Sequence, residues 1–336
     1  MVNRFIIFII AGVALLLAVM WALAAGQFPI SITELVSLIF ARITGTAAHA
    51  APNADVVLFE IRGPRMIAAL MVGAALAAAG AAYQNLFRNP LVSPDILGVS
   101  SGAALGAVLG IFLSLPIIAI QGLAFAGGLA AVTMIFFIGH KIRGHDPILA
   151  LVLTGVVVGS LLGSALALVK YLADPYNQLP AITYWLLGSF SSVTQQDAAI
   201  AAAVFVISLT PLFLLRWRIN LLALPDDEAR ALGLNVNRTR LIVILAATLM
   251  TGASVALCGI IGWVGLIVPH AVRLLVGAEF SRLLPLAMIV GGTFMLVIDT
   301  LGRTIAQVEI PPGVLTAAIG TPIFIGLMAA TFKRKN

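Results

Sequence analysis

The chain has 336 residues, of which 61% are hydrophobic and only 10% are charged, and its formal net charge is +6. Soluble domains carry roughly 25% charged residues, so a water-soluble fold of this length could not cover its surface. The composition therefore excludes a soluble enzyme or binding module and indicates an integral membrane protein. Its apolar runs reach about 20 residues and do not alternate in polarity, which favours membrane-spanning helices over a closed barrel.

Ten apolar runs predict an all-α membrane protein with about ten transmembrane helices in one domain, residues 1–336. The expected spans are 5–25, 62–84, 97–114, 117–139, 148–170, 196–215, 241–259, 261–277, 283–304 and 312–331. Ten spans divide into two sets of five, and because five is odd, such halves can be repeats only if they are inverted. The second span is crowded with Gly and Ala, which predicts a central place in the bundle.

Basic residues predict the orientation. With the N-terminus inside, only five of the 19 Lys and Arg residues fall in outer segments. These five are Arg42, Arg62, Arg65, Lys170 and Arg303. An excess of positive charge in short inner loops places both termini in the cytoplasm. Because the basic residues are scattered among short loops, they do not indicate nucleic-acid binding.

Three segments outside the spans are long enough to fold on their own. The outer segments 27–60 and 171–195 predict short interfacial helices. In the inner loop 216–240, Pro225 followed by three acidic residues is a helix-start signal, and Gly233 is a helix-end signal. Asn235 or Asn237 could cap a second short helix after it. Two such helices would form a rigid knob on the cytoplasmic side, whereas the alternative is an ordinary solvated loop.

The second span has unusual ends. It opens with Arg-Gly-Pro-Arg at residues 62–65, and a polar segment at residues 87–95 follows it. Pro90 and Pro94 forbid a simple continuous helix there. Because arginines and a polar hinge are costly in lipid, this pattern indicates docking or gating rather than simple anchoring.

Several catalytic and nucleotide-binding motifs are absent from the sequence. There is no Gly-rich P-loop, no His-Glu-x-x-His helix and no nucleophile elbow. We therefore expect that the chain is not an enzyme, holds no metal and binds no cofactor, and that another subunit supplies its energy.

Five stretches of the chain resemble the FecCD/BtuC-type permeases of ABC importers, in the order in which that family has them. The stretches are residues 62–65, 89–103, 226–233, 262–273 and 299–313. The resemblance extends over roughly 55–335, and several long motifs in the right order make it specific. It implies a BtuC-like type II importer fold in a bacterial or archaeal cytoplasmic membrane.

The resemblance also implies partners and site residues. It implies a homodimer with a pathway between the subunits, two ATPase subunits that carry ATP and Mg, and a periplasmic or lipid-anchored binding protein. The expected ATPase-coupling residues are Asp226, Asp227, Glu228, Arg230, Leu232 and Gly233. The expected cytoplasmic gate residues are Asn89 and Leu91, for which a plain structural hinge is the alternative.

Three outer arginines, Arg62, Arg65 and Arg303, match those that meet acidic residues of the binding protein in this family. Guanidinium groups suit bidentate pairing with carboxylates. The alternatives are snorkelling to the interface and pairing within the chain. Asp299 lies one helical turn before Arg303 and could hold it, and Glu309 could compete as well.

The substrate class is the least determined expectation. The family transports ferric siderophores, haem, cobalamin and, in some members, molybdate or tungstate, and a ferric siderophore is the default on family frequency. The rival class is a secondary transporter driven by an ion gradient, which would place acidic or His residues in the middle of its spans. The acidic residues here lie in loops or near span ends, with Asp299 the closest exception.

Overall fold

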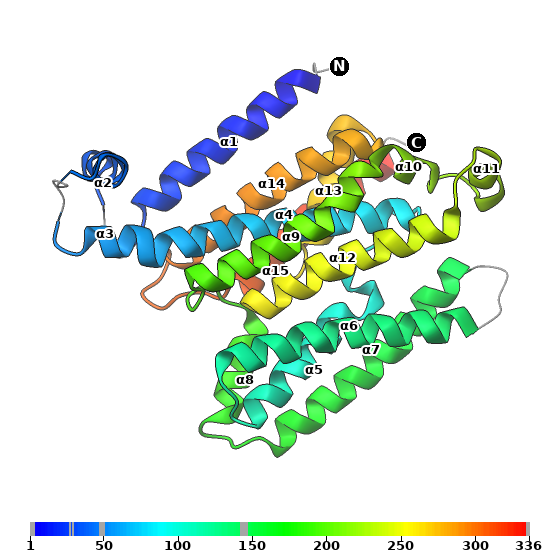
Figure 1. Ribbon diagram of the computed structural model, residues 1–336, viewed down its shortest axis with the longest axis horizontal. Helices are drawn as coiled ribbons and strands as arrows, with labels where there is room; N and C mark the ends of the chain where they lie inside the picture. Colours follow the sequence, from blue (N-terminus) through cyan, green and yellow to red (C-terminus); the bar gives the residue numbers. More distant parts are fainter. Residues whose placement is uncertain (1–3, 27, 29, 47–50, 142–146, 334–336) are drawn as a thin grey trace.

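The computed structural model describes residues 4–26, 28, 30–46, 51–141 and 147–333, and its long helices run side by side along one axis (Figure 1). Ten of them are long and apolar. They are α1 (Arg4–Ala24), α4 (Gly63–Leu86), α5 (Val99–Phe112), α6 (Ile117–Lys141), α7 (Pro147–Leu172), α9 (Gln195–Leu214), α12 (Val236–Cys258), α13 (Val264–Val276), α14 (Phe280–Gly302) and α15 (Pro312–Lys333). Each coincides with one of the ten expected spans, so the helical membrane fold is confirmed.

Eight of these ten helices are long enough to cross a membrane, whereas α5 and α13 are shorter. With 14 and 13 residues, they extend only about 20 Å against a hydrocarbon thickness of about 30 Å. A 3₁₀ turn, η2 (Pro94–Leu97), precedes α5, and the non-helical segment 259–263 precedes α13. Irregular backbone at such depth is tolerated where protein covers it.

The short helices occupy corresponding places in the two halves of the chain. They are the third and the eighth of the ten, and paired short segments of this kind are typical of inverted repeats. The second and seventh helices, α4 and α12, correspond in the same way. Each is 78% buried within the protein, more than any other candidate span in the described ranges.

Shorter helices lie at the two ends of the bundle (Figure 1). They are α2 (Ile32–Thr44), α3 (Ala54–Val56), the π-helix η1 (Val57–Arg62), α8 (Gln178–Leu187), α10 (Arg216–Leu221) and α11 (Asp226–Ala231). Helices α2 and α8 fall in the two outer segments as expected. The loop 216–240 holds two short helices, and α11 follows Pro225 as predicted. The other helix, α10, lies before Pro225, whereas the sequence predicted a second short helix after Gly233. Asn235 instead caps α12, accepting a hydrogen bond from the Arg238 N–H at 3.1 Å.

Helix α4 is the centre of the bundle and packs against α9, α12, α13 and α14. Small residues bring the backbones into direct contact, as association in lipid requires. A Cβ at Gly73 would overlap the carbonyl oxygen of Gly291 on α14. A Cβ at Gly80 would overlap the carbonyl oxygen of Gly265 on α13. The central place of this helix in the bundle, which its Gly and Ala content predicted, is therefore confirmed.

We expect Gly73→Val to destabilise the protein by about 1–3 kcal/mol or more, because the new side chain must push α14 away from α4. Gly12→Val on α1 is the matched control, since a Cβ at Gly12 meets no atom within 4 Å. Thermal unfolding in detergent measures both variants. Equal melting temperatures for the two would contradict the close contact of α4 with α14.

Candidate functional site

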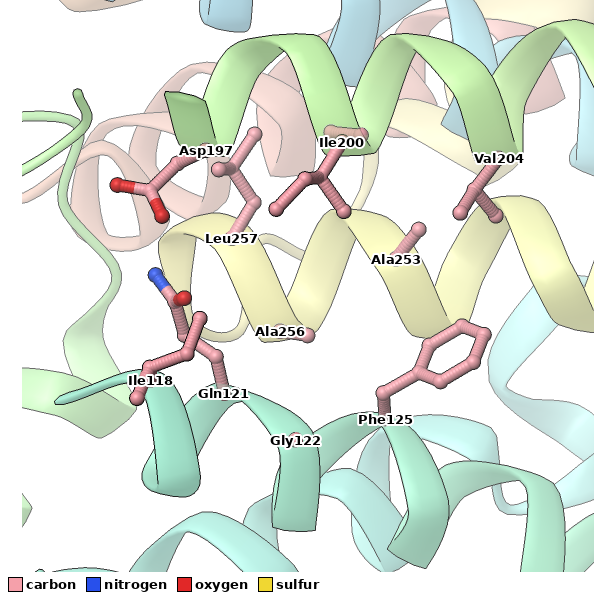
Figure 2. Close-up of a pocket in the computed structure, with 11 residues that line it drawn as sticks. Ile118, Gln121, Gly122, Phe125, Asp197, Ile200, Val204, Ala253, Ala256 and Leu257 are labelled. Carbon is pink, nitrogen blue, oxygen red and sulfur yellow. The ribbon is translucent and has the colours of Figure 1, made fainter. Parts of the chain in front are cut away.

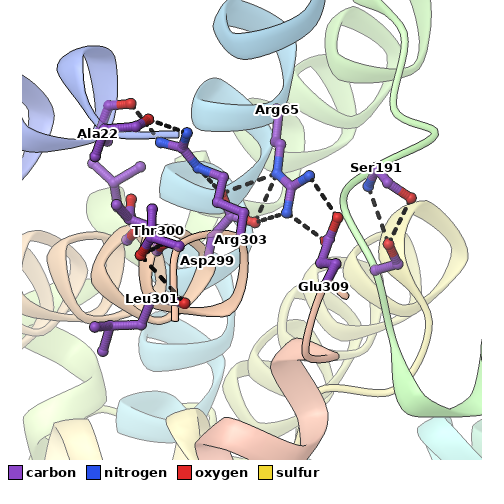
Figure 3. Close-up of polar contacts among 12 residues, drawn as sticks. Ala22, Arg65, Ser191, Asp299, Thr300, Leu301, Arg303 and Glu309 are labelled. Carbon is purple, nitrogen blue, oxygen red and sulfur yellow. Dashed lines mark hydrogen bonds and ion pairs between the residues drawn. The ribbon is translucent and has the colours of Figure 1, made fainter. Parts of the chain in front are cut away.

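The first candidate site is a cluster of charged side chains (Figure 3). It lies at the end of the bundle opposite α10 and α11, here called the outer end (Figure 1). This outer arginine cluster consists of Arg62, Arg65, Asp299, Arg303 and Glu309. Its members come from the end of η1, the start of α4, the end of α14 and the segment between α14 and α15. The Asp299 side chain is fully buried, and the side chains of Arg65 and Arg303 are each only 11% exposed.

Arg65 is held by two carboxylates. Its Nε donates to Oδ1 and Oδ2 of Asp299 at 2.9 and 3.1 Å, and its Nη2 donates to Oδ1 at 2.7 Å. On its other side, Nη1 donates to Oε2 of Glu309 at 3.1 Å and Nη2 donates to Oε1. Planar bidentate contacts of this kind are the strong form of an ion pair. They join α4 to α14 and to the loop before α15.

The other two arginines cap the end of α1. Arg62 donates two hydrogen bonds to backbone carbonyl oxygens, and so does Arg303. The four acceptors are the carbonyl oxygens of Leu23, Phe28, Ala22 and Ala25. The last carbonyls of a helix lack partners and form the negative end of its dipole, so guanidinium groups stabilise them. Arg303 also lies 3.8 Å from Asp299, from Nε to Oδ2.

The structure therefore brings together the three arginines that the sequence singled out, and each of them has partners within the chain. Arg62 is only 5% exposed. Asp299 and Glu309, considered as competitors at the sequence level, are among those partners. These contacts match the alternative of pairing within the chain, and docking to a binding protein stays a prediction.

We expect Asp299→Asn to lower the free energy of unfolding by about 3–5 kcal/mol, because it leaves buried guanidinium charge without its carboxylate. The control is Glu279→Gln, which removes the partly exposed ion pair of Glu279 with Arg282 at 3.0 Å and should cost less than about 1 kcal/mol. Thermal unfolding in detergent compares them. A melting temperature of Asp299→Asn equal to that of the control would show that the cluster contributes little to stability.

The second candidate site is the knob formed by α10 and α11 at the opposite, inner end. Five of its six predicted coupling residues are exposed, namely Asp227, Glu228, Arg230, Leu232 and Gly233. Leu232 presents 61% of its surface although it is apolar. Buried Leu222, Ala229 and Leu234 fix the knob to the bundle. The knob thus has a fixed base and a free outer surface suited to another protein.

Asp226, the sixth predicted coupling residue, has a different position from the other five. Its Oδ1 accepts from Nη2 of Arg88 at 2.7 Å, and both carboxylate oxygens lie 3.1 Å from Nη2 of Arg240. Partial burial opposes ionisation, but the charges and hydrogen bonds of Arg240 and Arg88 outweigh it and hold the pKa of Asp226 below its usual range. Asp226 therefore ties the knob to the bundle and is ionised at neutral pH.

Arg88 is a residue whose importance sequence reasoning missed. In the sequence it is one residue of the polar segment 87–95 and directly precedes the predicted gate residue Asn89, and nothing there indicates its partner. Its backbone has φ +52, which is uncommon outside glycine. Its side chain joins Asp226 of the knob and also donates from Nε to the Leu222 carbonyl at 3.0 Å. One side chain thus connects the segment after α4 with the knob.

The predicted gate residues lie in that same segment. Asn89 Oδ1 accepts from the Leu91 N–H at 2.9 Å and so closes its own turn, as Asn often does. Leu91 is 45% exposed. Pro94 packs against Gly265 at the start of α13. The geometry is that of a rigid bend with an exposed apolar tip, and the gating role stays a prediction.

A buried polar stripe lies beside this segment, between α4 and α13. Gln84 Nε2 donates to the Leu266 carbonyl at 3.1 Å, and Arg273 Nη2 donates to Asn85 Oδ1 at 2.9 Å. His270 lies between these contacts on the same helix face and is only 4% exposed. Neither its ring nitrogens nor Gln84 Oε1 and Arg273 Nε have a hydrogen-bond partner among the described residues.

Comparisons with known proteins give a consistent result. The family model for the FecCD transport family matches residues 14–330. The molybdate import permease MolB of Haemophilus influenzae is 37% identical over 97% of this chain and 96% of its own. A probable iron chelatin permease of Helicobacter pylori is 39% identical over 82% of this chain and 83% of its own. A solved metal-chelate type ABC transporter in an inward-facing conformation matches 98% of this chain and 100% of its own, with 34% identity and a TM-score of 0.87.

Proposed function

The chain belongs to the FecCD transport family, and from that premise we propose that it is the permease subunit of an ABC importer for a metal chelate. ATP hydrolysis takes place on two separate ATPase subunits, and this chain forms a homodimer with the pathway between its two copies. The observation that carries the proposal is the exposed knob of α10 and α11, whose base is tied to the segment after α4.

The coupling path follows from these contacts. The ATPase binds the exposed surface of α11, and its closure moves the knob. Because Asp226 holds both Arg88 and Arg240, this movement reaches α4 and α12 together. The two helices shift as nearly rigid bodies and change which side of the membrane the pathway faces. Asn89 and Leu91, next to Arg88, form the cytoplasmic gate in this scheme.

We expect Glu228→Lys combined with Leu232→Glu to insert normally and to reduce ATP-driven transport about tenfold or more, because both side chains belong to the exposed docking surface. The control is Lys141→Glu, which reverses an exposed charge at the inner end of α6. Uptake into proteoliposomes with the cognate ATPase and binding protein measures both. Normal transport by the double variant would contradict the coupling assignment.

For the outer end we propose that the binding protein docks over the arginine cluster by competing with Glu309. The cluster has three guanidinium groups for two carboxylates, so it keeps an excess positive charge. Glu309 is its most exposed acid, at 26%, and lies in the loop before α15. An acidic side chain of the binding protein can replace Glu309 on Arg65 while Asp299 stays in place. Docking then leaves the buried ion pair intact.

We expect Glu309→Gln to tighten binding-protein docking several-fold, because it weakens the internal competitor for Arg65. Glu60→Gln is the control: Glu60 lies at the same end, is exposed and pairs with Gln195 instead. Binding to nanodisc-embedded complex reports the affinity. A similar change in both variants would indicate general electrostatics, and an unchanged or weaker affinity for Glu309→Gln alone would contradict direct competition.

The orientation is proposed from charge. In Figure 1, α1 begins and α15 ends at the same end of the bundle, and α10 and α11 lie at that end too. Among the described residues, Arg4 at the start of α1 and Arg216 and Arg218 on α10 lie at this end, which supports a cytoplasmic location for both termini. A cysteine introduced near either terminus should react with a membrane-impermeant reagent only after the membrane is opened.

The substrate we propose is a ferric siderophore, and molybdate is the second candidate. Relatives are named for iron chelatin, hemin, Fe(3+)-citrate and cobalamin, which supports a metal complex. The molybdate permease covers nearly the whole chain, which favours the second candidate. Elemental analysis and mass spectrometry of the ligand that co-purifies with the cognate binding protein separate the two. Iron with an organic chelator supports the first, and molybdenum without one supports the second.

A gradient-driven transporter fits the geometry less well. Such a mechanism needs a buried ionisable group free to take up and release its ion. The buried acid Asp299 of α14 is occupied by Arg65, which leaves His270 on α13 as the single buried ionisable side chain described above that has no partner for such a role. Uptake that requires ATP and resists collapse of the ion gradient distinguishes the importer from this rival.

A further inference from the structure

A long apolar groove lies between α6, α9 and α12 near the outer end of the bundle (Figure 2). Its volume of about 360 Å³ falls within the range of ligand pockets in proteins. Figure 2 shows α9 and α6 as its two walls and α12 between them, with Ala253, Ala256 and Leu257 facing the space. The small side chains of Ala253 and Ala256 on α12 leave this space unfilled.

The rim of the groove is apolar and exposed on the surface of the chain. Ile118 and Ile200 on its rim are 58% and 51% exposed, whereas Ala256 and Leu257 at its base are each 9% exposed. Helix α9 is mostly apolar after Asp197, and only 17% of its apolar stretch is buried within the protein. The groove is therefore continuous with an exposed apolar surface of the bundle, and its occupant must be apolar along most of its length.

The outer end of the groove is polar. Figure 2 shows the Asp197 carboxylate and the Gln121 amide together at this end, with Phe125 and Val204 at the other. Asp197 caps α9 through Oδ2 alone, which accepts from the N–H and the hydroxyl of Thr194 at 3.0 and 2.7 Å. Its Oδ1 accepts no hydrogen bond from the described residues. Asp197 is the only charged residue among those that line the groove.

We propose that this groove binds one acyl chain of a phospholipid whose headgroup carries a primary amine, of the phosphatidylethanolamine class. The chain lies along α12, and the ammonium group donates to Oδ1 of Asp197 at headgroup depth. Asp197 is the third residue of α9 and Gln121 the fifth of α6, so both lie where these spans reach the membrane surface. A negatively charged mouth disfavours an anionic headgroup by like-charge repulsion, which makes the site selective.

The groove is separate from the two candidate functional sites described above. It lies between α6, α9 and α12, and none of its lining residues belongs to the outer arginine cluster or to the knob. A lipid held there would fill the space between α6 and the pair α9 and α12, which pack on one another. We infer that it stabilises this part of the bundle in the membrane.

Native mass spectrometry of the full-length protein in detergent, titrated with dioleoyl-phosphatidylethanolamine or dioleoyl-phosphatidylglycerol, tests the proposal. We expect the first lipid to bind about tenfold more tightly, the effect of one hydrogen bond to a charged group. Asp197→Asn keeps the capping oxygen but removes the charge, and it should abolish this preference. Gly122→Leu fills the groove, since a Cβ there meets no atom within 4 Å, and should reduce the binding of both lipids.

Gly12→Leu on α1 is the matched control for added bulk and should leave lipid binding unchanged. Equal affinities of the two lipids in the unmodified protein would overturn the headgroup assignment. Equal lipid occupancy in Gly122→Leu and Gly12→Leu would overturn the groove as the site. Loss of the dimer in Gly122→Leu, with lipid binding unaffected, would show that a second copy of the chain covers the groove instead.

Discussion

The close contact of α4 with its neighbours is the constraint on which the rest of this structure depends. Lipid offers no hydrophobic force to bring helices together, so packing must come from backbone approach and polar contacts. Gly73 and Gly80 leave no space between α4 and the backbones of α14 and α13. A helix held in this way over 24 residues, about 36 Å, transmits a displacement at one end to the other. The outer arginine cluster lies at one end of α4, and the segment that contacts the knob follows its other end.

The outer end shows how buried charge is stabilised in such a bundle. Arg65 is neutralised by carboxylates, whereas Arg62 and Arg303 use the carbonyl oxygens that every helix end leaves without partners. The end of α1 therefore supplies acceptors for two guanidinium groups. Arg62 has no carboxylate partner among the described residues, and Arg303 has only the 3.8 Å contact with Asp299. Gly26 is required in this arrangement, because a side chain there would collide with both Arg62 and Arg303. The cluster thus fixes α1, which otherwise has little buried surface, to α4 and α14.

The sequence was sufficient to predict the ten helices, the central place of α4 and the helix start at Asp226, because each depends on local composition or spacing. It could not predict which partner a charge would choose. Asp226 carried the same signal as Asp227 and Glu228, yet it alone faces Arg88 and Arg240, which lie 138 and 14 residues away. Arg88 was missed for the same reason. The groove on α12 was also invisible, since it exists only where three helices distant in sequence leave a space between them.

The two ends of α4 differ in how fully their polar groups are satisfied, and this difference bears on where movement begins. At the outer end the arginines and Asp299 have hydrogen-bond partners, with Arg303 Nε the one buried nitrogen left over in the cluster. At the inner end Gln84, His270 and Arg273 each keep a buried polar atom without a partner in the described part of the chain. Such a group costs about 1–3 kcal/mol where neither protein nor water pairs with it. A rearrangement that gives these atoms partners recovers part of that energy, whereas one at the outer end must break bonds already made. The inner end, next to Asn89 and the knob, is therefore the end at which the helices can move at lower cost.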